Sequence, residues 1–186
     1  MSHVDEKNYL IVQYDMLIHE YTKSVRSKDS FVDIITPYFS NFKIPTRWPS
    51  FSSNFLNISD IDNFRDLIRL LRQNFVRIRI MTLSAEQETK KKLTDIYIEN
   101  KKSFLEFLHD IGCEVYFTPL NHGKMTVTSQ AVLFGSANYT ITGLRGDLQW
   151  NVGHYFPKTK DVDYEQKRNY VSEKFNDSNV ARWFPN

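Results

Sequence analysis

The sequence predicts an α/β fold, in which a mixed β-sheet carries helices on both of its faces. Short runs rich in apolar and β-branched residues alternate along the chain with longer segments whose apolar residues recur at helical spacing. Their order is strand, helix, strand, helix, strand and then two strands joined by a tight turn, which suggests both parallel and antiparallel neighbours. The length of 186 residues suits one domain, so we expect residues 1–186 to form a single unit.

The first part of the chain is expected to hold a helix, a strand, a loop and a second helix. An amphipathic helix is predicted over residues 6–26, and the apolar run of residues 31–39 predicts a buried strand. Residues 41–58 carry two prolines and several serines, which is typical of a long loop, and their aromatic residues favour an ordered flap. Ser59 or Asp60 can cap the following helix. The apolar residues that this helix is expected to bury are Ile61, Phe64, Leu67, Ile68 and Leu71.

The remaining elements follow from the same two periodicities. Alternating or continuous apolar runs predict strands, and Gly112 lies where the C-terminal cap of a helix belongs. The expected elements are a strand over 76–83, a helix over 86–111, a strand over 113–119, two strands within 121–135 joined at 128–130, a strand over 148–156 and a C-terminal helical segment over 161–184.

The composition is that of a globular protein and excludes several classes of function. Hydrophobic residues make up 41% of the chain, and the formal net charge of +2 is too small to predict a polyanion partner by itself. The single cysteine, Cys113, excludes an intramolecular disulfide and a cysteine-based zinc cluster. No apolar stretch approaches the ~20 residues of a membrane span, and the first residues lack the apolar region of a signal peptide. We therefore expect a cytoplasmic protein with no membrane partner.

One short segment carries the strongest functional signal. His122 and Lys124 form a His-x-Lys pair, and an apolar run separates them from a Gly-Ser-x-Asn sequence at Gly135, Ser136 and Asn138. These residue types suit phosphoryl chemistry, because an imidazole can attack phosphorus and an ammonium can hold phosphoryl oxygens. A carboxamide and a hydroxyl can donate further hydrogen bonds to the same oxygens.

This pattern resembles the HKD motif of the phospholipase D superfamily, whose members break phosphodiester bonds through a phosphohistidine intermediate without a metal. The resemblance extends from about Phe31 to Phe156 and implies a phospholipase D-like mixed sheet flanked by helices. It implies that His122 is the nucleophile. It also implies that Lys124 and Asn138 hold the non-bridging phosphate oxygens.

The same resemblance implies the roles of the neighbouring residues and the assembly. Ser136 would support the phosphate contacts or merely a turn, and Gly135 would permit close approach of the backbone. The His-x-Lys pattern occurs once in the chain, whereas release of the leaving oxygen needs a second, protonated imidazole. Single-motif nucleases of this superfamily are symmetric dimers, so we expect a homodimer that brings two copies of His122 together.

Two positions depart from the family pattern. The aspartate expected after the lysine is replaced by Ser129, and the glutamate expected after the Gly-Ser-x-Asn sequence is replaced by Gln149. Glutamine can accept a hydrogen bond from an imidazole N–H group but cannot stabilise an imidazolium by charge. Asp147 lies two residues earlier and is either a substitute carboxylate or a turn residue.

The sequence therefore predicts a metal-independent phosphodiesterase, an endonuclease whose partner is nucleic acid, with DNA as the first expectation. No cofactor or metal is expected, because Asp95, Glu99 and Lys101, which superficially resemble a metal-nuclease site, fall on a lysine-rich helical face. Basic residues favour nucleic acid over phospholipid. They are Arg65, Arg69, Arg72, Arg77 and Arg79.

Two alternatives stay open. A non-catalytic nucleic-acid-binding subunit is consistent with Gln149, and a phospholipid hydrolase would use the aromatic loop at residues 41–58 as its amphipathic surface. The lack of an obvious specificity domain suggests the further hypothesis of a nuclease subunit in a restriction or defence system.

Overall fold

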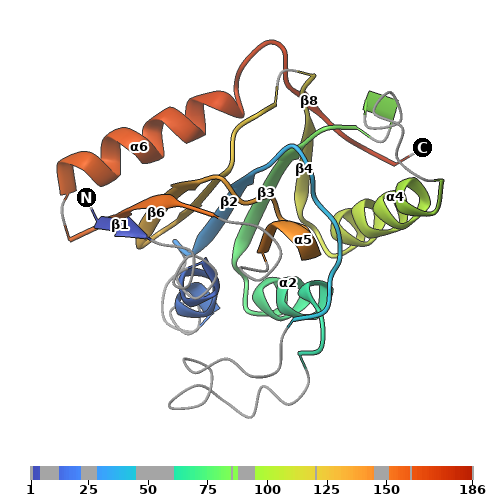
Figure 1. Ribbon diagram of the computed structural model, residues 1–186, viewed down its shortest axis with the longest axis horizontal. Helices are drawn as coiled ribbons and strands as arrows, with labels where there is room; N and C mark the ends of the chain where they lie inside the picture. The colour runs from blue at the N-terminus through green and yellow to red at the C-terminus, as the bar shows by residue number, and fades with distance from the viewer. Residues whose placement is uncertain are drawn as a thin grey trace.

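The described strands of the computed structural model form one mixed sheet of eight strands in the order β1-β7-β6-β5-β2-β3-β4-β8 (Figure 1). The residues that the structure describes are 2–4, 13–21, 29–44, 61–84, 86–87, 95–119, 121–144, 151–159 and 161–185. The strands are β1 (Ser2–Val4), β2 (Phe31–Ile35), β3 (Arg77–Thr82), β4 (Glu114–Phe117), β5 (Met125–Thr128), β6 (Ala131–Gly135), β7 (Gly153–Pro157) and β8 (Ala181–Arg182). The helices with described bounds are α2 (Phe64–Gln73), α4 (Asp95–Asp110), α5 (Ile141–Leu144) and α6 (Asp161–Lys174), and residues 13–21 are also helical.

The carboxyl ends of the parallel strands lie at one edge of the sheet. Strands β2, β3 and β4 are parallel to one another, whereas β5 runs antiparallel to β2. Ile35, the last residue of β2, therefore pairs with Met125, the first residue of β5. The carboxyl ends of the parallel strands thus lie beside the segment that enters β5.

Helices cover both faces of the sheet, as the sequence predicts. The helical residues 13–21, α2 and α4 lie on one face, and α6 lies on the other (Figure 1). Strand β2 contributes side chains to the hydrophobic cores on both faces of the sheet, because successive side chains point to opposite faces. Val32 and Ile34 belong to the larger core under α2 and α4, and Phe31 and Ile35 to the smaller core under α6.

Helix α2 begins later than the sequence suggests. Its N-cap is Asn63, whose side chain accepts a hydrogen bond from the Asp66 N–H group at 3.2 Å, while Ser59 and Asp60 lie outside the described residues. The prediction for the end of α4 is confirmed. Gly112 has a φ of +81°, and a Cβ atom there would lie 2.8 Å from the Arg72 guanidinium.

The C-terminal helical segment expected over residues 161–184 is shorter than predicted. Helix α6 ends at Lys174, and Ala181–Arg182 form the edge strand β8 beside β4. Asp177 accepts a hydrogen bond from the Asn179 N–H group at 2.9 Å, a local side-chain bond that competes with helix continuation. The chain therefore turns and returns to the sheet.

The N-terminal helix and the long loop are described only in part. Residues 13–21 of the helix expected over 6–26 are helical, and the rest of that range lies outside the described residues. In the loop expected over 41–58, residues 41–44 are described and Phe42 is buried, stacked on Phe64 with ring centroids 5.0 Å apart. Residues 45–58 lie outside the described residues.

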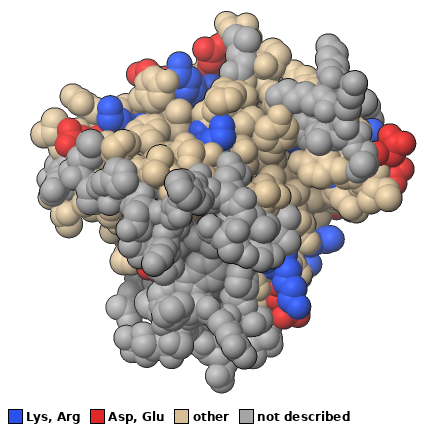
Figure 2. Space-filling model, viewed as in Figure 1, with Lys and Arg blue, Asp and Glu red and all other residues tan. Residues whose placement is uncertain are grey.

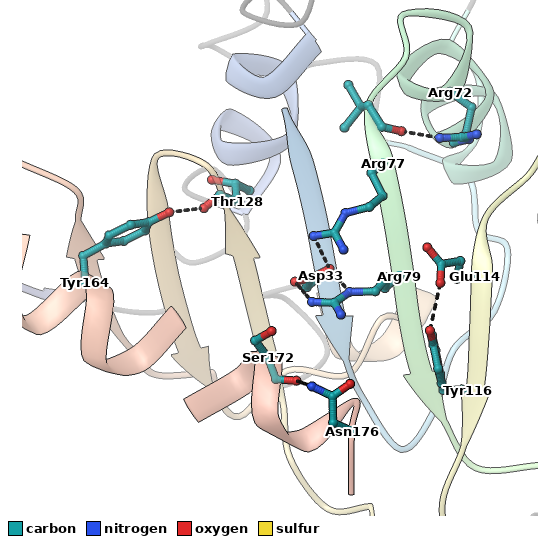
Figure 3. A network of polar contacts seen from close by, with 11 residues as sticks. Asp33, Arg72, Arg77, Arg79, Glu114, Tyr116, Thr128, Tyr164, Ser172 and Asn176 are labelled. Carbon is teal, nitrogen blue, oxygen red and sulfur yellow. Dashed lines mark hydrogen bonds and ion pairs between the residues drawn. The ribbon is translucent and has the colours of Figure 1, made fainter. Parts of the chain in front are cut away.

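A buried ion pair lies on the face of the sheet that α6 covers (Figure 3). The Asp33 carboxylate on β2 accepts two hydrogen bonds from Arg79 on β3, at 2.8 and 2.6 Å, and lies 3.8 Å from the Arg77 guanidinium. The Arg79 guanidinium lies 4.4 Å from the centroid of the Phe175 ring, just after α6. Burial of the Asp33 carboxylate is tolerated because the carboxylate and the Arg79 guanidinium neutralise each other and are hydrogen-bonded.

Candidate active site

The His-x-Lys pair lies in the segment between β4 and β5, and buried Asn121 holds that segment in place. The Asn121 amide donates a hydrogen bond to the Met81 carbonyl on β3, and its oxygen accepts one from the Gly123 N–H group, both at 3.1 Å. His122, between them, is exposed. The ammonium of Lys124 donates to the His122 carbonyl at 3.2 Å. The pair therefore stands at the sheet edge on a clamped backbone.

The β5–β6 hairpin brings the second half of the motif beside the first. Met125 pairs with Phe134, and the Gly135 N–H group donates to the Lys124 carbonyl at 2.9 Å. Residues after Gly135 therefore leave the sheet at the edge where His122 and Lys124 enter it. The register of the β5–β6 hairpin therefore brings the two halves of the motif to the same edge of the sheet.

Ser136 supports the backbone at this edge. Its hydroxyl donates to the Asn151 carboxamide oxygen at 3.0 Å and accepts a hydrogen bond from the Val152 N–H group at 3.1 Å. Asn151 in turn donates to the Gly143 carbonyl at 2.8 Å. The sequence left two roles open for Ser136, contact with phosphate or support of a turn. These hydrogen bonds favour support of a turn.

Asn138 is tied to the end of β2. The Thr36 hydroxyl lies 3.4 Å from the Asn138 carboxamide oxygen, 2.9 Å from the Tyr38 carbonyl and 3.4 Å from the Tyr139 N–H nitrogen. Gly143 packs closely on the same residue, because a Cβ atom at Gly143 would lie 2.9 Å from the Asn138 backbone nitrogen. The supporting roles of Thr36 and Asn121 were not predicted from the sequence.

The motif borders two cavities. Asn138 lines a cavity of about 750 Å³ among α2, α4 and the segments after β2 and β6. His122 lines a second cavity of about 280 Å³, which the end of α6 also borders through Tyr170 and Lys174. The two halves of the motif therefore line different cavities, one beside α2 and α4 and the other beside α6.

Comparison with known proteins identifies the family. The family described as "Cardiolipin synthase, PLD-like domain" matches residues 23–166, which is more than half of the chain. This chain is a PLD-like domain of the phospholipase D superfamily. Among curated proteins, none matches the chain in sequence.

Solved structures share the fold of this PLD-like domain at low sequence identity. The phospholipase D family member Nuc from Salmonella typhimurium is 11% identical with a TM-score of 0.54, and the alignment covers 90% of each chain. NucT from Helicobacter pylori is 12% identical with a TM-score of 0.54 over 98% of each chain. TrmBL2, an archaeal chromatin protein described with a novel mode of DNA binding, is 10% identical with a TM-score of 0.51. That alignment covers 98% of this chain and 52% of TrmBL2.

The PLD-like domain has an unexpected contact where the family aspartate is missing. Ser129 is buried, and its hydroxyl donates to the Glu20 carboxylate at 2.7 Å. Glu20 is fully buried on the N-terminal helix. Helical periodicity alone does not distinguish it from the other charged residues of that helix. Gln149, the other departure from the family pattern, and Asp147, its possible substitute, lie outside the described residues.

The five arginines of the PLD-like domain do not form one basic surface. Arg77 and Arg79 pair with Asp33, Arg72 donates to the carbonyl groups of Ile111 and Val76, and Arg69 pairs with Asp66. Arg65 alone among these five lines the cavity beside Asn138. On the face shown in Figure 2, described basic and acidic side chains are scattered among neutral ones. The arginines therefore carry less of the argument for nucleic acid than the sequence suggests.

Within the described residues, no three His, Cys, Asp or Glu side chains gather as metal ligands. No helix within the described part of the chain is long and apolar enough to cross a membrane. Burial raises the pKa of the Cys113 thiol to about 12, so this thiol stays protonated near neutral pH.

Proposed function

We propose that this PLD-like domain is a metal-independent phosphodiesterase, specifically an endonuclease that cleaves nucleic acid through a phosphohistidine intermediate at a site shared by two copies of the chain. The observation that carries the proposal is the β5–β6 register. It sets His122 and Lys124 at the same sheet edge as Gly135, with Asn138 just beyond. Membership of the PLD-like domain family supports phosphodiester chemistry at this edge.

The residues divide the reaction between them. A neutral imidazole nitrogen of His122 attacks the phosphorus, and the phosphorus–oxygen bond to the leaving group breaks. The leaving oxygen takes its proton from an imidazolium. Water, deprotonated by the imidazole that has just given up its proton, then attacks the phosphohistidine and frees the nucleophile. The Lys124 ammonium and the Asn138 carboxamide donate hydrogen bonds to the non-bridging oxygens, where negative charge accumulates.

A second copy of the chain supplies the acid. One histidine cannot be an unprotonated nucleophile and a protonated acid in the same step, and the His-x-Lys pattern occurs once per chain. His122 is exposed at the sheet edge and so is accessible to a partner. A two-fold axis through this edge would pair His122 with its own copy.

Phospholipid is the second candidate substrate, because the family description names cardiolipin synthase. The cavity beside Asn138 favours nucleic acid. Hydroxyl, carboxamide and phenol groups predominate among its described lining residues, whereas acyl chains require apolar walls. DNA and RNA share the phosphodiester that the motif addresses, and DNA is tested first.

The test is cleavage of supercoiled plasmid and single-stranded DNA by the purified chain in excess EDTA, beside His122→Ala. The proposal expects cleavage by the wild type and none by the variant. Activity that disappears in EDTA and returns with magnesium would contradict the mechanism. Nucleic-acid binding without cleavage in the wild type would favour the non-catalytic subunit.

A further inference from the structure

The cavity of about 750 Å³ beside Asn138 has a shape and lining that the motif chemistry does not use. One wall is a single face of α4, where Tyr97, Asn100 and Phe104 are spaced three and four residues apart. The segment after β2 and Arg65 at the start of α2 also line the cavity. Asn138 lies at its border, so the cavity adjoins the proposed phosphate position.

Aromatic and polar side chains line this cavity together. Phe104 is 2% exposed and stacks on Phe39, with ring centroids 5.3 Å apart and planes 7° apart. On the same face of α4, Tyr97 is half-buried and Asn100 is exposed. A planar group that enters the cavity would meet the Tyr97 ring for stacking and the Asn100 carboxamide for hydrogen bonds at its edge.

The charges of the lining residues suit an uncharged group that is part of a larger anionic molecule. The described lining residues include no carboxylate, and Arg65 is the one cation among them. The Arg65 guanidinium lies 3.9 Å from the centroid of the Phe107 ring. The described lining therefore presents one positive and no negative charge to a polyanion.

The cavity is not itself a phosphate cradle. The N–H groups at the start of α2 are already bonded, that of Phe64 to the Phe42 carbonyl and that of Arg65 to the Asn41 carboxamide, both at 2.9 Å. The helix end thus has none of these donors left for an anion. The group that fits is planar and uncharged.

We propose that this cavity receives an unpaired nucleobase from the nucleotide next to the phosphate held at Asn138, with the base stacked on Tyr97 and its edge bonded to Asn100. The substrate class is then single-stranded or locally unpaired nucleic acid, because a base inside a duplex has its edge paired and its faces stacked. A volume of about 750 Å³ lies in the range of small-molecule sites and accommodates a nucleotide. The position of the phosphate rests on the proposed function.

Binding measurements test this assignment apart from cleavage. In a His122→Ala background, which keeps the probes intact, affinity is measured for a fluorescent single-stranded DNA, its duplex and an abasic strand of equal length. The single strand is expected to bind most tightly. Tyr97→Ala and Asn100→Ala should each weaken its binding, Tyr97→Ala by about 5- to 150-fold, with little change for the duplex and the abasic strand. Phe75→Ala, which alters an aromatic side chain that is 90% exposed at the other end of α2, is the matched control.

The outcomes separate the two proposals. Unchanged single-strand affinity in the correctly folded Asn100→Ala and Tyr97→Ala variants would overturn the nucleobase assignment, even if the wild type cleaves DNA. Equal losses for the single strand, the duplex and the abasic strand would overturn it as well. Tyr97-dependent binding to phosphatidylglycerol vesicles without oligonucleotide binding would replace it with a lipid site. The expected binding pattern in a chain that never cleaves would leave the nucleobase site in place and refute the endonuclease.

Discussion

Asn121→Ala tests whether the clamp on the His122 segment matters for catalysis. The substitution removes the bond to the Met81 carbonyl and the bond from the Gly123 N–H group, both 3.1 Å long. The Met81 carbonyl keeps the Thr36 N–H group as a partner at 2.9 Å, and Gly123 is only half-buried. Neither group is therefore left buried without a partner, and the expected loss of unfolding free energy is about 1–2 kcal/mol.

The expected effect on the rate is larger than the effect on stability. A displacement of a reacting group by about 1 Å can lower the rate ~10²-fold. Released from its clamp, the backbone around His122 can shift by such an amount. The turnover number should fall by about this factor while KM changes little, because the contacts of the substrate with Asn138 are kept. Asn121→Asp keeps the acceptor for Gly123 but turns a buried carboxylate oxygen toward the Met81 carbonyl, so its losses of rate and stability should be at least as large as those of Asn121→Ala.

The assay combines chemical unfolding with steady-state cleavage of single-stranded DNA. Asn176→Ala is the control, because Asn176 is exposed and its amide makes one long bond of 3.5 Å. A wild-type turnover number in Asn121→Ala, together with the expected loss of stability, would show that the clamp is only structural and would refute the reasoning.

Three further predictions concern assembly, the departures from the family pattern and alkaline stability. The active species should be a dimer, and mixing His122→Ala with wild-type chains should yield heterodimers without full turnover; an active monomer in light scattering would contradict this. Gln149→Ala should lower cleavage without loss of binding if Gln149 orients the imidazole, whereas Asp147→Asn should be the more damaging change if Asp147 supplies the carboxylate; wild-type rates in both would exclude either role. Burial raises the pKa of Cys113 from 9.0 and of Tyr139 from 10.0, each to about 12, so the unfolded chain loses these protons first and the unfolding free energy should fall from pH 9 upward. Urea unfolding at several pH values, with Cys113→Ala expected to show a shallower decline, measures this, and constant stability up to pH 11 would disprove it.

Much of the fold and half of the site follow from local patterns in the sequence. The α/β class, the strands β2 and β3, the β5–β6 hairpin and the Gly112 cap are set by periodicity and turn residues within a few positions of one another. The hairpin is short, so its register alone brings Lys124 beside Gly135. The residue types of the motif likewise indicate phosphoryl chemistry without any knowledge of the packing.

Only the tertiary structure decided which distant side chains support the motif and which surfaces lie next to it. Thr36 reaches Asn138, Asn121 reaches Met81 and Ser129 reaches Glu20 across 102, 40 and 109 positions of the chain. Of the arginines that the sequence offers as a basic surface, Arg79 is bound to Asp33 and Arg72 to the Ile111 carbonyl, across 46 and 39 positions of the chain. Periodicity determines which face of an element a residue occupies, whereas the neighbour it meets on that face depends on how the elements pack together.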